Sequence, residues 1–147
     1  MLNRILLGPH GWKLDRIAVR WLGYSPMSRA YAQQHGLKDE SRTLLLVTKG
    51  RKSGRRRSVA LSYFEVGGHL IVVGSKGGAP TDPAWVTNLR ADPKAAIYVG
   101  GKKRRVTARI AAGEERAPLW QRLAADVPTY AQFQEQVSRE IPLVILE

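Results

Sequence analysis

Two short apolar segments flank the stretch Thr48-Lys49-Gly50-Arg51-Lys52-Ser53-Gly54-Arg55-Arg56-Arg57-Ser58, on which the expected fold depends. The segments at 43–47 and 59–66 are rich in β-branched, leucine and aromatic residues, and turn residues bound them, so we expect two strands. Gly50 and Gly54 let the intervening backbone turn and approach a ligand closely. The stretch therefore predicts a β-hairpin with a glycine-containing tip.

The tip of this hairpin is strongly basic, because six of the nine residues from 49 to 57 are Lys or Arg. Backbone N–H groups, Arg side chains and a Ser hydroxyl together suit a multiply charged anion such as phosphate. The spacing is not the G-x-x-x-x-G-K-[ST] of a Walker loop. Two interpretations follow, an anion-binding cradle and a solvated charged tip without a ligand.

Length, charge and cysteine content limit the classes of protein to which this chain can belong. The 147 residues suffice for one core, and contents of 44% hydrophobic and 24% charged residues fit a globular domain. A net charge of +12 indicates an anionic partner, namely nucleic acid, an anionic membrane or a small polyanion. The absence of cysteine excludes disulfides and thiolate metal sites. With no apolar run near the roughly 20 residues of a membrane span and no recognisable signal peptide, we expect a cytoplasmic protein.

We divide the chain into an N-terminal helical segment, 1–38, and a main domain, 39–147. One apolar stripe of the first helix contains Leu14, Ile17, Ala18, Trp21 and Leu22, and the other side carries Lys13, Arg16 and Arg20. The helix either packs on the main domain or lies at a membrane surface, with Trp12 and Trp21 in lipid and the basic side on anionic headgroups. A further short helix is expected at 27–34.

The rest of the main domain alternates strands with helices. We expect strands at 69–74, 95–99, 105–111 and 143–146, and helices at 83–90, 113–127 and 129–134. Asp82 is expected as the N-cap of the first of these helices, with Pro83 at its first position. Residues 100–104 would form a second basic tip. Six strands with helices between hairpins predict an α+β fold whose antiparallel sheet is closed or nearly closed into a barrel.

Familiar catalytic constellations are missing. His10, His35 and His69 stand in unrelated contexts, so we expect no metal site. The sequence also lacks a G-x-S-x-G elbow and any suggestive pair of acids. If the protein is an enzyme, a cofactor would carry the reaction while the protein binds and orients it. The first basic tip, the loop 75–78 and the helix carrying Trp85 and Asn88 would then form the receptor.

Four separated motifs resemble the deazaflavin-dependent nitroreductase family. They are TKGRKSGRRR at 48–57, GSKGGAP at 74–80, DPAWVTNL at 82–89, and PTYAQF at 128–133 with IPLVILE at 141–147. The resemblance covers about residues 40–147 and implies a split β-barrel related to those that bind FMN. It also implies coenzyme F420, an 8-hydroxy-5-deazaflavin with a phospholactyl-polyglutamate tail, and the reduction of quinones, enones or nitro compounds by its reduced form.

The same resemblance implies a set of site residues. Arg51, Lys52, Ser53 and Arg57 would bind the phosphate and tail; Ser58, Val59, Ala60, Leu61 and Ser62 would run beside the ring; Val73, Gly74, Ser75 and Lys76 would line its other edge; and Ala84, Trp85, Val86, Thr87 and Asn88 would lie along the cofactor. Tyr130 would close the pocket near the substrate, and Ser75 and Tyr130 are the expected catalytic residues. From the residues alone, Trp85 and Tyr130 would be core side chains.

The sequence departs from the resembled family at three positions. Val127, Phe133 and Ser62 stand where members that reduce nitro drugs carry tyrosines. The corresponding hydroxyl groups are therefore missing, and the resemblance predicts cofactor binding more firmly than activity on a nitro compound.

We therefore expect an F420H2-dependent reductase that transfers a hydride to an electron-poor acceptor. The alternatives are a split-barrel reductase that binds FMN, a carrier of F420 without turnover, and a basic nucleic-acid-binding protein. No aromatic residues interleave with the basic ones at the tips, which argues against nucleic acid. A monomer is favoured over an oligomer, and the N-terminal helix would contact the inner face of the cell membrane in the second interpretation above.

Overall fold

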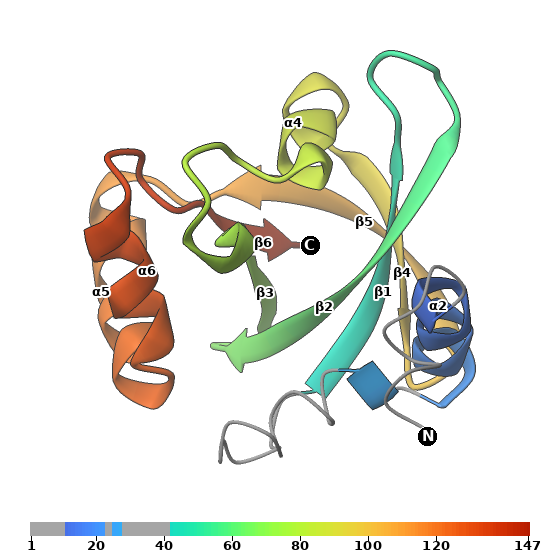
Figure 1. Ribbon diagram of the computed structural model, residues 1–147, viewed down its shortest axis with the longest axis horizontal. Coiled ribbons are helices and arrows are strands. Elements are labelled where there is room, and N and C mark those ends of the chain that lie inside the picture. Colours follow the sequence, from blue (N-terminus) through green and yellow to red (C-terminus); the bar gives the residue numbers. More distant parts are fainter. Residues whose placement is uncertain (1–10, 23–24, 28–41) are drawn as a thin grey trace.

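A closed β-barrel forms the body of the molecule (Figure 1), whose computed structural model describes residues 11–22, 25–27 and 42–147. Its six antiparallel strands follow the order β1-β2-β3-β6-β5-β4 around the barrel. They are β1 (Arg42–Lys49), β2 (Arg56–Val66), β3 (His69–Val73), β4 (Lys94–Val99), β5 (Lys102–Ile110) and β6 (Leu143–Leu146). The predicted closed antiparallel sheet is thus confirmed, whereas the predicted division at 38/39 and residues 28–34 of the predicted short helix lie outside the described residues.

Apolar side chains that point inward from the strands fill the barrel interior. Leu44 and Leu46 of β1 are fully buried in one cluster with Val72, Ile97, Val144 and other inward side chains. The helix α4 (Ala84–Ala91) adds Trp85, Val86 and Leu89 to this cluster. Each such side chain contributes about 1.5–3 kcal/mol by leaving water. Helix α4 is therefore fixed by the core, and its position is as well defined as that of the strands.

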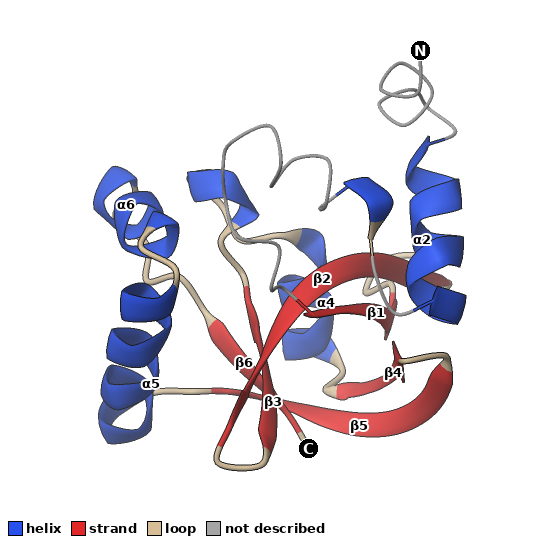
Figure 2. Ribbon diagram, turned by 90° about the horizontal axis from the view of Figure 1, so that it is seen from below, coloured by secondary structure: helices blue, strands red, loops and turns tan. Residues whose placement is uncertain are grey.

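A second cluster covers the outer face of β3 and β6. Ile71, Val73, Leu143 and Ile145 alternate with the inward residues of the same strands and pack with Leu123 and other residues of α5 and α6. The helices α5 (Gly113–Asp126) and α6 (Thr129–Gln136) lie together along this side of the barrel (Figure 2). Burial on both faces explains why β3 and β6 appear in the sequence as uninterrupted apolar runs.

Two predicted turns differ from the structure. Both hairpins extend further than predicted, so the first tip is only 50–55 and the second is Gly100-Gly101 alone. Both glycines of the second tip have positive φ, 56° and 79°, which suits a two-residue hairpin turn. The predicted second basic tip at 100–104 is therefore wrong, because its three basic residues belong to β5.

The predicted cap of α4 is also wrong. Pro83 occupies the N-cap position with extended backbone, φ −63° and ψ 151°, and makes no side-chain capping bond. The helix begins one residue later than expected, at Ala84. The carboxylate of Asp82 forms ion pairs with Arg90 and Arg139. These two charged partners hold the carboxylate in place of the backbone N–H groups of the helix.

Helix α2 (Gly11–Leu22) contacts β1, β2 and β4, but not through the predicted apolar stripe. Its buried positions are Gly11, Asp15 and Val19, and Asp15 accepts hydrogen bonds from the Ser25 hydroxyl at 2.8 Å and the Met27 N–H at 2.9 Å. The large apolar side chains are exposed, namely Trp12 (61%), Leu14 (52%), Ile17 (55%) and Trp21 (65%). The apolar periodicity correctly predicted that Leu14, Ile17 and Trp21 share one side of the helix. A different side of the helix packs against the barrel.

None of the described helices is both long and apolar enough to span a lipid bilayer.

Candidate functional site

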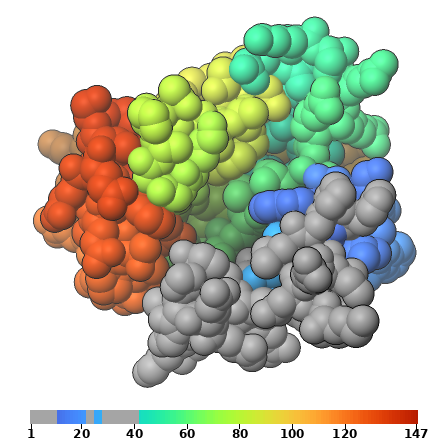
Figure 3. Space-filling view, viewed as in Figure 1, coloured from blue at the N-terminus to red at the C-terminus, as the bar shows by residue number. Residues whose placement is uncertain are grey.

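An open pocket of about 430 Å³, the first groove, lies between the tip of the β1–β2 hairpin and α4. Its lining residues are Thr48, Gly50, Arg51, Lys52, Ser53, Arg57, Ser58, Val59, Ala84, Trp85 and Asn88. The hairpin tip projects beyond the rest of this face beside the segment that carries α4 (Figure 3). The volume falls within the range typical of small-molecule sites, about 300–1,000 Å³.

The hairpin tip has a defined backbone conformation. The Gly50 N–H donates to the Arg55 carbonyl at 2.7 Å, and the Gly54 N–H donates to the Gly50 carbonyl at 2.8 Å. A Cβ at position 50 would lie 2.8 Å from Ser53 Oγ, so only glycine fits without rearrangement. Ser53 Oγ in turn accepts from the Arg55 N–H at 3.2 Å. The basic side chains therefore project from an ordered turn.

The buried amide of Asn88 joins α4 to this tip. Its Oδ1 accepts hydrogen bonds from the Arg51 backbone N–H at 3.2 Å and from Arg51 Nη1 at 3.0 Å. Its Nδ2 donates to the Thr48 hydroxyl at 3.2 Å. Because Asn88 is only 3% exposed, losing any of these bonds would leave a buried polar group unpaired, at about 1–3 kcal/mol. The amide thus places Arg51 at the edge of the first groove.

The first groove is electropositive. Arg51, Lys52 and Arg57 line it from the exposed tip, and no carboxylate is among its lining residues. Within the described ranges, none of the three forms an ion pair with Asp or Glu. Three cations beside the Ser53 hydroxyl form a site that fits a multiply charged anion.

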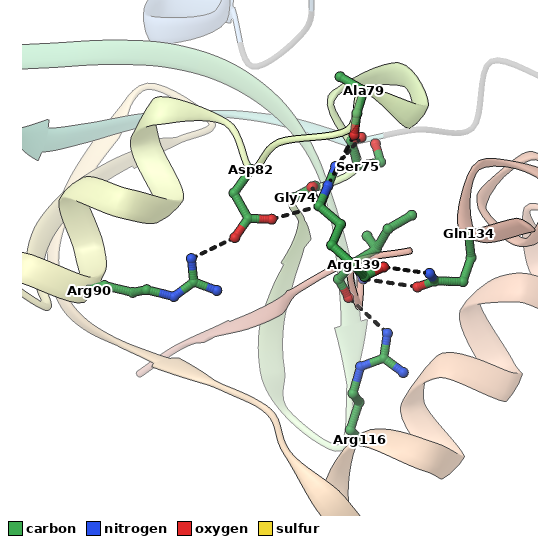
Figure 4. Close-up of polar contacts among 9 residues, drawn as sticks. Gly74, Ser75, Ala79, Asp82, Arg90, Arg116, Gln134 and Arg139 are labelled. Carbon is green, nitrogen blue, oxygen red and sulfur yellow. Dashed lines mark hydrogen bonds and ion pairs between the residues drawn. The ribbon is translucent and has the colours of Figure 1, made fainter. Parts of the chain in front are cut away.

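A second ordered segment, the loop 74–82, follows β3 and is held by Arg139 (Figure 4). The Arg139 side chain, 14% exposed, donates to the carbonyl oxygens of Gly74 at 3.2 Å, Ser75 at 2.9 Å and Ala79 at 3.0 Å. Its Nη1 also pairs with Asp82 Oδ1 at 2.7 Å. One guanidinium therefore fixes both ends of the loop in the conformation that precedes α4.

The loop conformation is an unusual one. Lys76 has a φ of 46°, which a residue with a side chain rarely adopts, and Gly77 and Gly78 follow with 62° and 79°. Strain of this kind is retained where surrounding contacts determine the conformation. Among the described residues, no acceptor takes a hydrogen bond from the N–H groups of Ser75, Lys76 or Gly77. Three adjacent donors therefore remain available to a ligand.

Tyr130 of α6 lies in the second hydrophobic cluster, outside the barrel. Its ring meets that of Phe64 edge to face, with centroids 5.9 Å apart. Burial raises the pKa of the Tyr130 hydroxyl to about 12. The hydroxyl is therefore protonated at neutral pH and can donate a hydrogen bond or a proton.

Nine of the predicted site residues line the first groove: Arg51, Lys52, Ser53, Arg57, Ser58, Val59, Ala84, Trp85 and Asn88. The others lie beyond that lining: Ala60, Leu61 and Ser62 further along β2; Val73, Gly74, Ser75 and Lys76 where β3 ends; Val86 and Thr87 on α4; and Tyr130 on α6. Trp85 is both a core residue and a groove residue, as its two interpretations suggested separately. The predicted set omitted Thr48 and Gly50 of the first groove, and also Arg139, which holds the loop 74–82.

A family model and a curated relative both match this chain to F420H(2)-dependent quinone reductases. A family model described as F420H(2)-dependent quinone reductase matches residues 27–147. An F420H(2)-dependent quinone reductase of Mycobacterium tuberculosis (strain H37Rv) is 38% identical over 107 residues, which cover 71% of this chain and 72% of the relative.

Two solved structures agree with the family match. An F420-H2 dependent reductase (FDR-A) superposes with a TM-score of 0.64 and 39% identity, covering 71% of this chain and 93% of that chain. A second structure, described as a domain-swapped dimer, has a TM-score of 0.65 and 33% identity, covering 84% of this chain and all of the other. Both cover more than two thirds of this chain at more than 30% identity.

Proposed function

The chain belongs to the F420H(2)-dependent quinone reductase family, and from that premise we propose that its first groove holds the anionic part of coenzyme F420 while the protein reduces a quinone. The observation that carries the proposal is the first groove itself, where Arg51, Lys52 and Arg57 converge without a neighbouring carboxylate. A phosphate that continues into a chain of carboxylates matches such a site in charge and in the type of hydrogen bond.

The residues present fit this cofactor on two grounds. The first groove, of about 430 Å³, is open rather than enclosed, so a long anionic tail can extend from it. The donor set consists of Lys and Arg side chains and a Ser hydroxyl, all of which bind phosphate oxygens. Reduced F420 supplies the hydride when it is bound.

The chain's own groups orient the reactants and stabilise the developing negative charge. The loop 74–82 offers the N–H groups of Ser75, Lys76 and Gly77, whose geometry Arg139 fixes before any ligand arrives. Donors fixed in this way require no reorganisation when charge develops on an acceptor oxygen. The protonated hydroxyl of Tyr130 is the second donor in this proposal, and its high pKa keeps it protonated throughout the physiological range.

The binding test compares F420 with FMN. We expect the purified protein to bind F420 more tightly than FMN, with an affinity that falls as salt is added, because screening weakens charge pairs at an exposed tip. Fluorescence titration of each cofactor at two ionic strengths measures both effects. Equal affinity for F420 and FMN at low salt would favour the FMN-binding alternative, and tight F420 binding without oxidation of F420H2 by any quinone would favour the carrier.

We also propose that α2 brings the protein to the inner face of the cell membrane. The support comes from three large apolar side chains on one side, Leu14, Ile17 and Trp21, each more than half exposed. Lys13 and Arg16 of the same helix are suited to anionic headgroups, at about 1 kcal/mol for each basic residue near the surface. Co-sedimentation with anionic and with neutral vesicles tests this, and protein that stays in the supernatant with both would contradict it.

For the free protein we propose a cytoplasmic monomer. All six strands of the barrel come from one chain, so closure needs no partner. A related structure is described as a domain-swapped dimer, so the number of chains per particle in solution has to be measured. Light scattering after size-exclusion chromatography answers it, with a mass of one chain expected and a mass of two chains contradicting the proposal.

A further inference from the structure

A second groove, of about 420 Å³, lies on the other face of the β1–β2 hairpin. Its lining residues are Val47, Thr48, Lys49, Gly54, Arg56, Lys94, Ala95, Ala96, Tyr98, Lys103 and Arg105. Successive residues of a strand point to opposite faces, so Thr48 and Arg57 serve the first groove while Lys49 and Arg56 serve the second. The two grooves share Thr48 but none of their basic side chains.

The second groove gathers five cations, Lys49, Arg56, Lys94, Lys103 and Arg105, from four strands. No carboxylate lines it, and none of the five forms an ion pair within the described part of the chain. The nearby Asp92 is engaged by the backbone N–H of Lys94 at 3.1 Å. Arg20 of α2 adds a further positive charge at the rim, with its guanidinium 4.7 Å from the ring centroid of Tyr98.

The arrangement places like charges opposite each other on ordered strands. Lys49 and Arg56 are direct cross-strand partners in the β1–β2 ladder. The last pair of the β1–β4 ladder is Val47 with Ala96, and the same register continued by two residues brings Lys94 opposite Lys49. Like charges in such positions destabilise a sheet. Local rules of this kind are broken most often at functional sites, where a ligand compensates for the cost.

We propose that the second groove binds a small, multiply charged anion, of the phosphate or polycarboxylate class, independently of the cofactor in the first groove. The size argues for a small ligand, because the volume falls within the usual range for small-molecule pockets. The floor formed by Val47, Ala96 and Tyr98 gives such a ligand an apolar surface beneath its charges. Bound there, it neutralises the cations that face one another across the hairpin.

Pyrophosphate is the probe for the test, titrated by calorimetry at constant ionic strength into protein saturated with F420. The expected result is one pyrophosphate per chain in the presence of the cofactor. The double variant Lys49→Gln/Arg56→Gln should weaken pyrophosphate binding by about tenfold or more, because two charge-assisted contacts are lost. The double variant Lys94→Gln/Arg105→Gln repeats the test on β4 and β5. Its result does not depend on whether the substitutions at Lys49 and Arg56 change the conformation of the β1–β2 hairpin.

The matched control removes two charges from the first groove. Lys52→Gln/Arg57→Gln, titrated without cofactor, should bind pyrophosphate at the second groove as the wild type does. Citrate in place of pyrophosphate reports whether carboxylates are accepted as well. The proposal is overturned if protein saturated with F420 binds no pyrophosphate, if all three charge-removing pairs weaken binding at the second groove equally, or if a DNA oligomer binds at the second groove while pyrophosphate and citrate do not.

Discussion

Single residues decide the electrostatics of the first groove. Lys52 and Arg57 are exposed side chains that no acid neutralises in the described part of the chain. Replacing both by Ala should weaken F420 binding by roughly 2–4 kcal/mol, if each makes a charge-assisted bond to the ligand. Fluorescence titration measures the loss, and the melting temperature should stay nearly constant because exposed substitutions leave the core intact.

A matched control for this variant is available on β5. Lys102 and Arg104 are also exposed cations, and they line neither groove. Replacing them by Ala removes the same charge, so a general charge effect would weaken F420 binding equally in both variants. An unchanged affinity after the replacement of Lys52 and Arg57 would assign the anion site elsewhere.

Tyr130 gives a pH prediction. Its folded-state pKa of about 12 lies above the ordinary value of 10.0, because burial disfavours the tyrosinate. The unfolded chain therefore loses this proton first. The associated stability is fully present below pH 10 and is lost as pH rises towards 12, by about 2–3 kcal/mol. Urea unfolding across this pH range should show the fall in the wild type and a smaller fall in Tyr130→Phe, and equal slopes would contradict it.

The residues of the site were predictable from sequence to different degrees. The composition of the glycine-containing basic run 49–57 was enough to predict an anion site. Helical spacing placed Asn88 on the receptor helix, but its hydrogen-bond partners could not be predicted, because they lie about 40 residues away and depend on how α4 meets the hairpin. Arg139 gave no signal, since the acceptors of its guanidinium lie 57–65 residues away and a single Arg in a polar stretch is ordinarily solvated.

At the scale of elements, Arg139 connects the segment before β6 to the loop before α4. The variant Arg139→Met leaves three carbonyls and Asp82 without this donor, so we expect the unfolding free energy to fall by about 2–4 kcal/mol. Urea denaturation measures it. Arg90→Met is the control, because Arg90 is 47% exposed and, among the described residues, pairs with Asp82 alone, so its loss should cost less than about 1 kcal/mol.

The Arg139 variant also separates two roles of the site. The hairpin tip, which does not contact Arg139, sets F420 affinity in this account, whereas the loop 74–82 places donors near the reacting atoms. Turnover of Arg139→Lys should therefore fall more than its affinity for F420. A loss of affinity without a loss of turnover would show that the loop serves binding alone.

Substitutions on helix α2 should change protein stability and membrane binding independently of each other. Leu14 and Ile17 are 52% and 55% exposed, so the double Gln variant should keep its unfolding free energy within about 0.5 kcal/mol. The same variant should lose co-sedimentation with anionic vesicles. Val19→Ala provides the contrast, because Val19 is fully buried and its truncation should cost about 1–2 kcal/mol while vesicle binding is retained. Undiminished vesicle binding by the Gln variant would exclude the stripe as the contact.

Element types were easier to predict than element ends. Strands such as β3 and β6 follow from apolar runs between turn residues, and so does β1, in which residues 43–46 are all buried. The cap of α4 was misassigned because Asp82 has a stronger competing partner, Arg139, that no local pattern reveals. The stripe of α2 identified side chains that share a face, and periodicity carries no information on which face the barrel will cover.

At the scale of the whole molecule, the charge of +12 is concentrated in part on the two faces of one hairpin. The barrel supplies a rigid base from which this hairpin projects, and α4 buttresses it through Asn88. Eight of the 24 Lys and Arg residues line these two small pockets.

The most direct test of the central claim is an anaerobic turnover experiment. The purified protein is mixed with F420H2 and a soluble quinone, and the return of oxidised F420 absorbance is followed over time. The account predicts one quinone reduced per F420H2 consumed, with the rate at limiting F420H2 greatly reduced by the loss of Lys52 and Arg57 and no comparable rate with reduced FMN. Absence of F420H2 oxidation above the protein-free rate, or equal rates with reduced FMN, would contradict it.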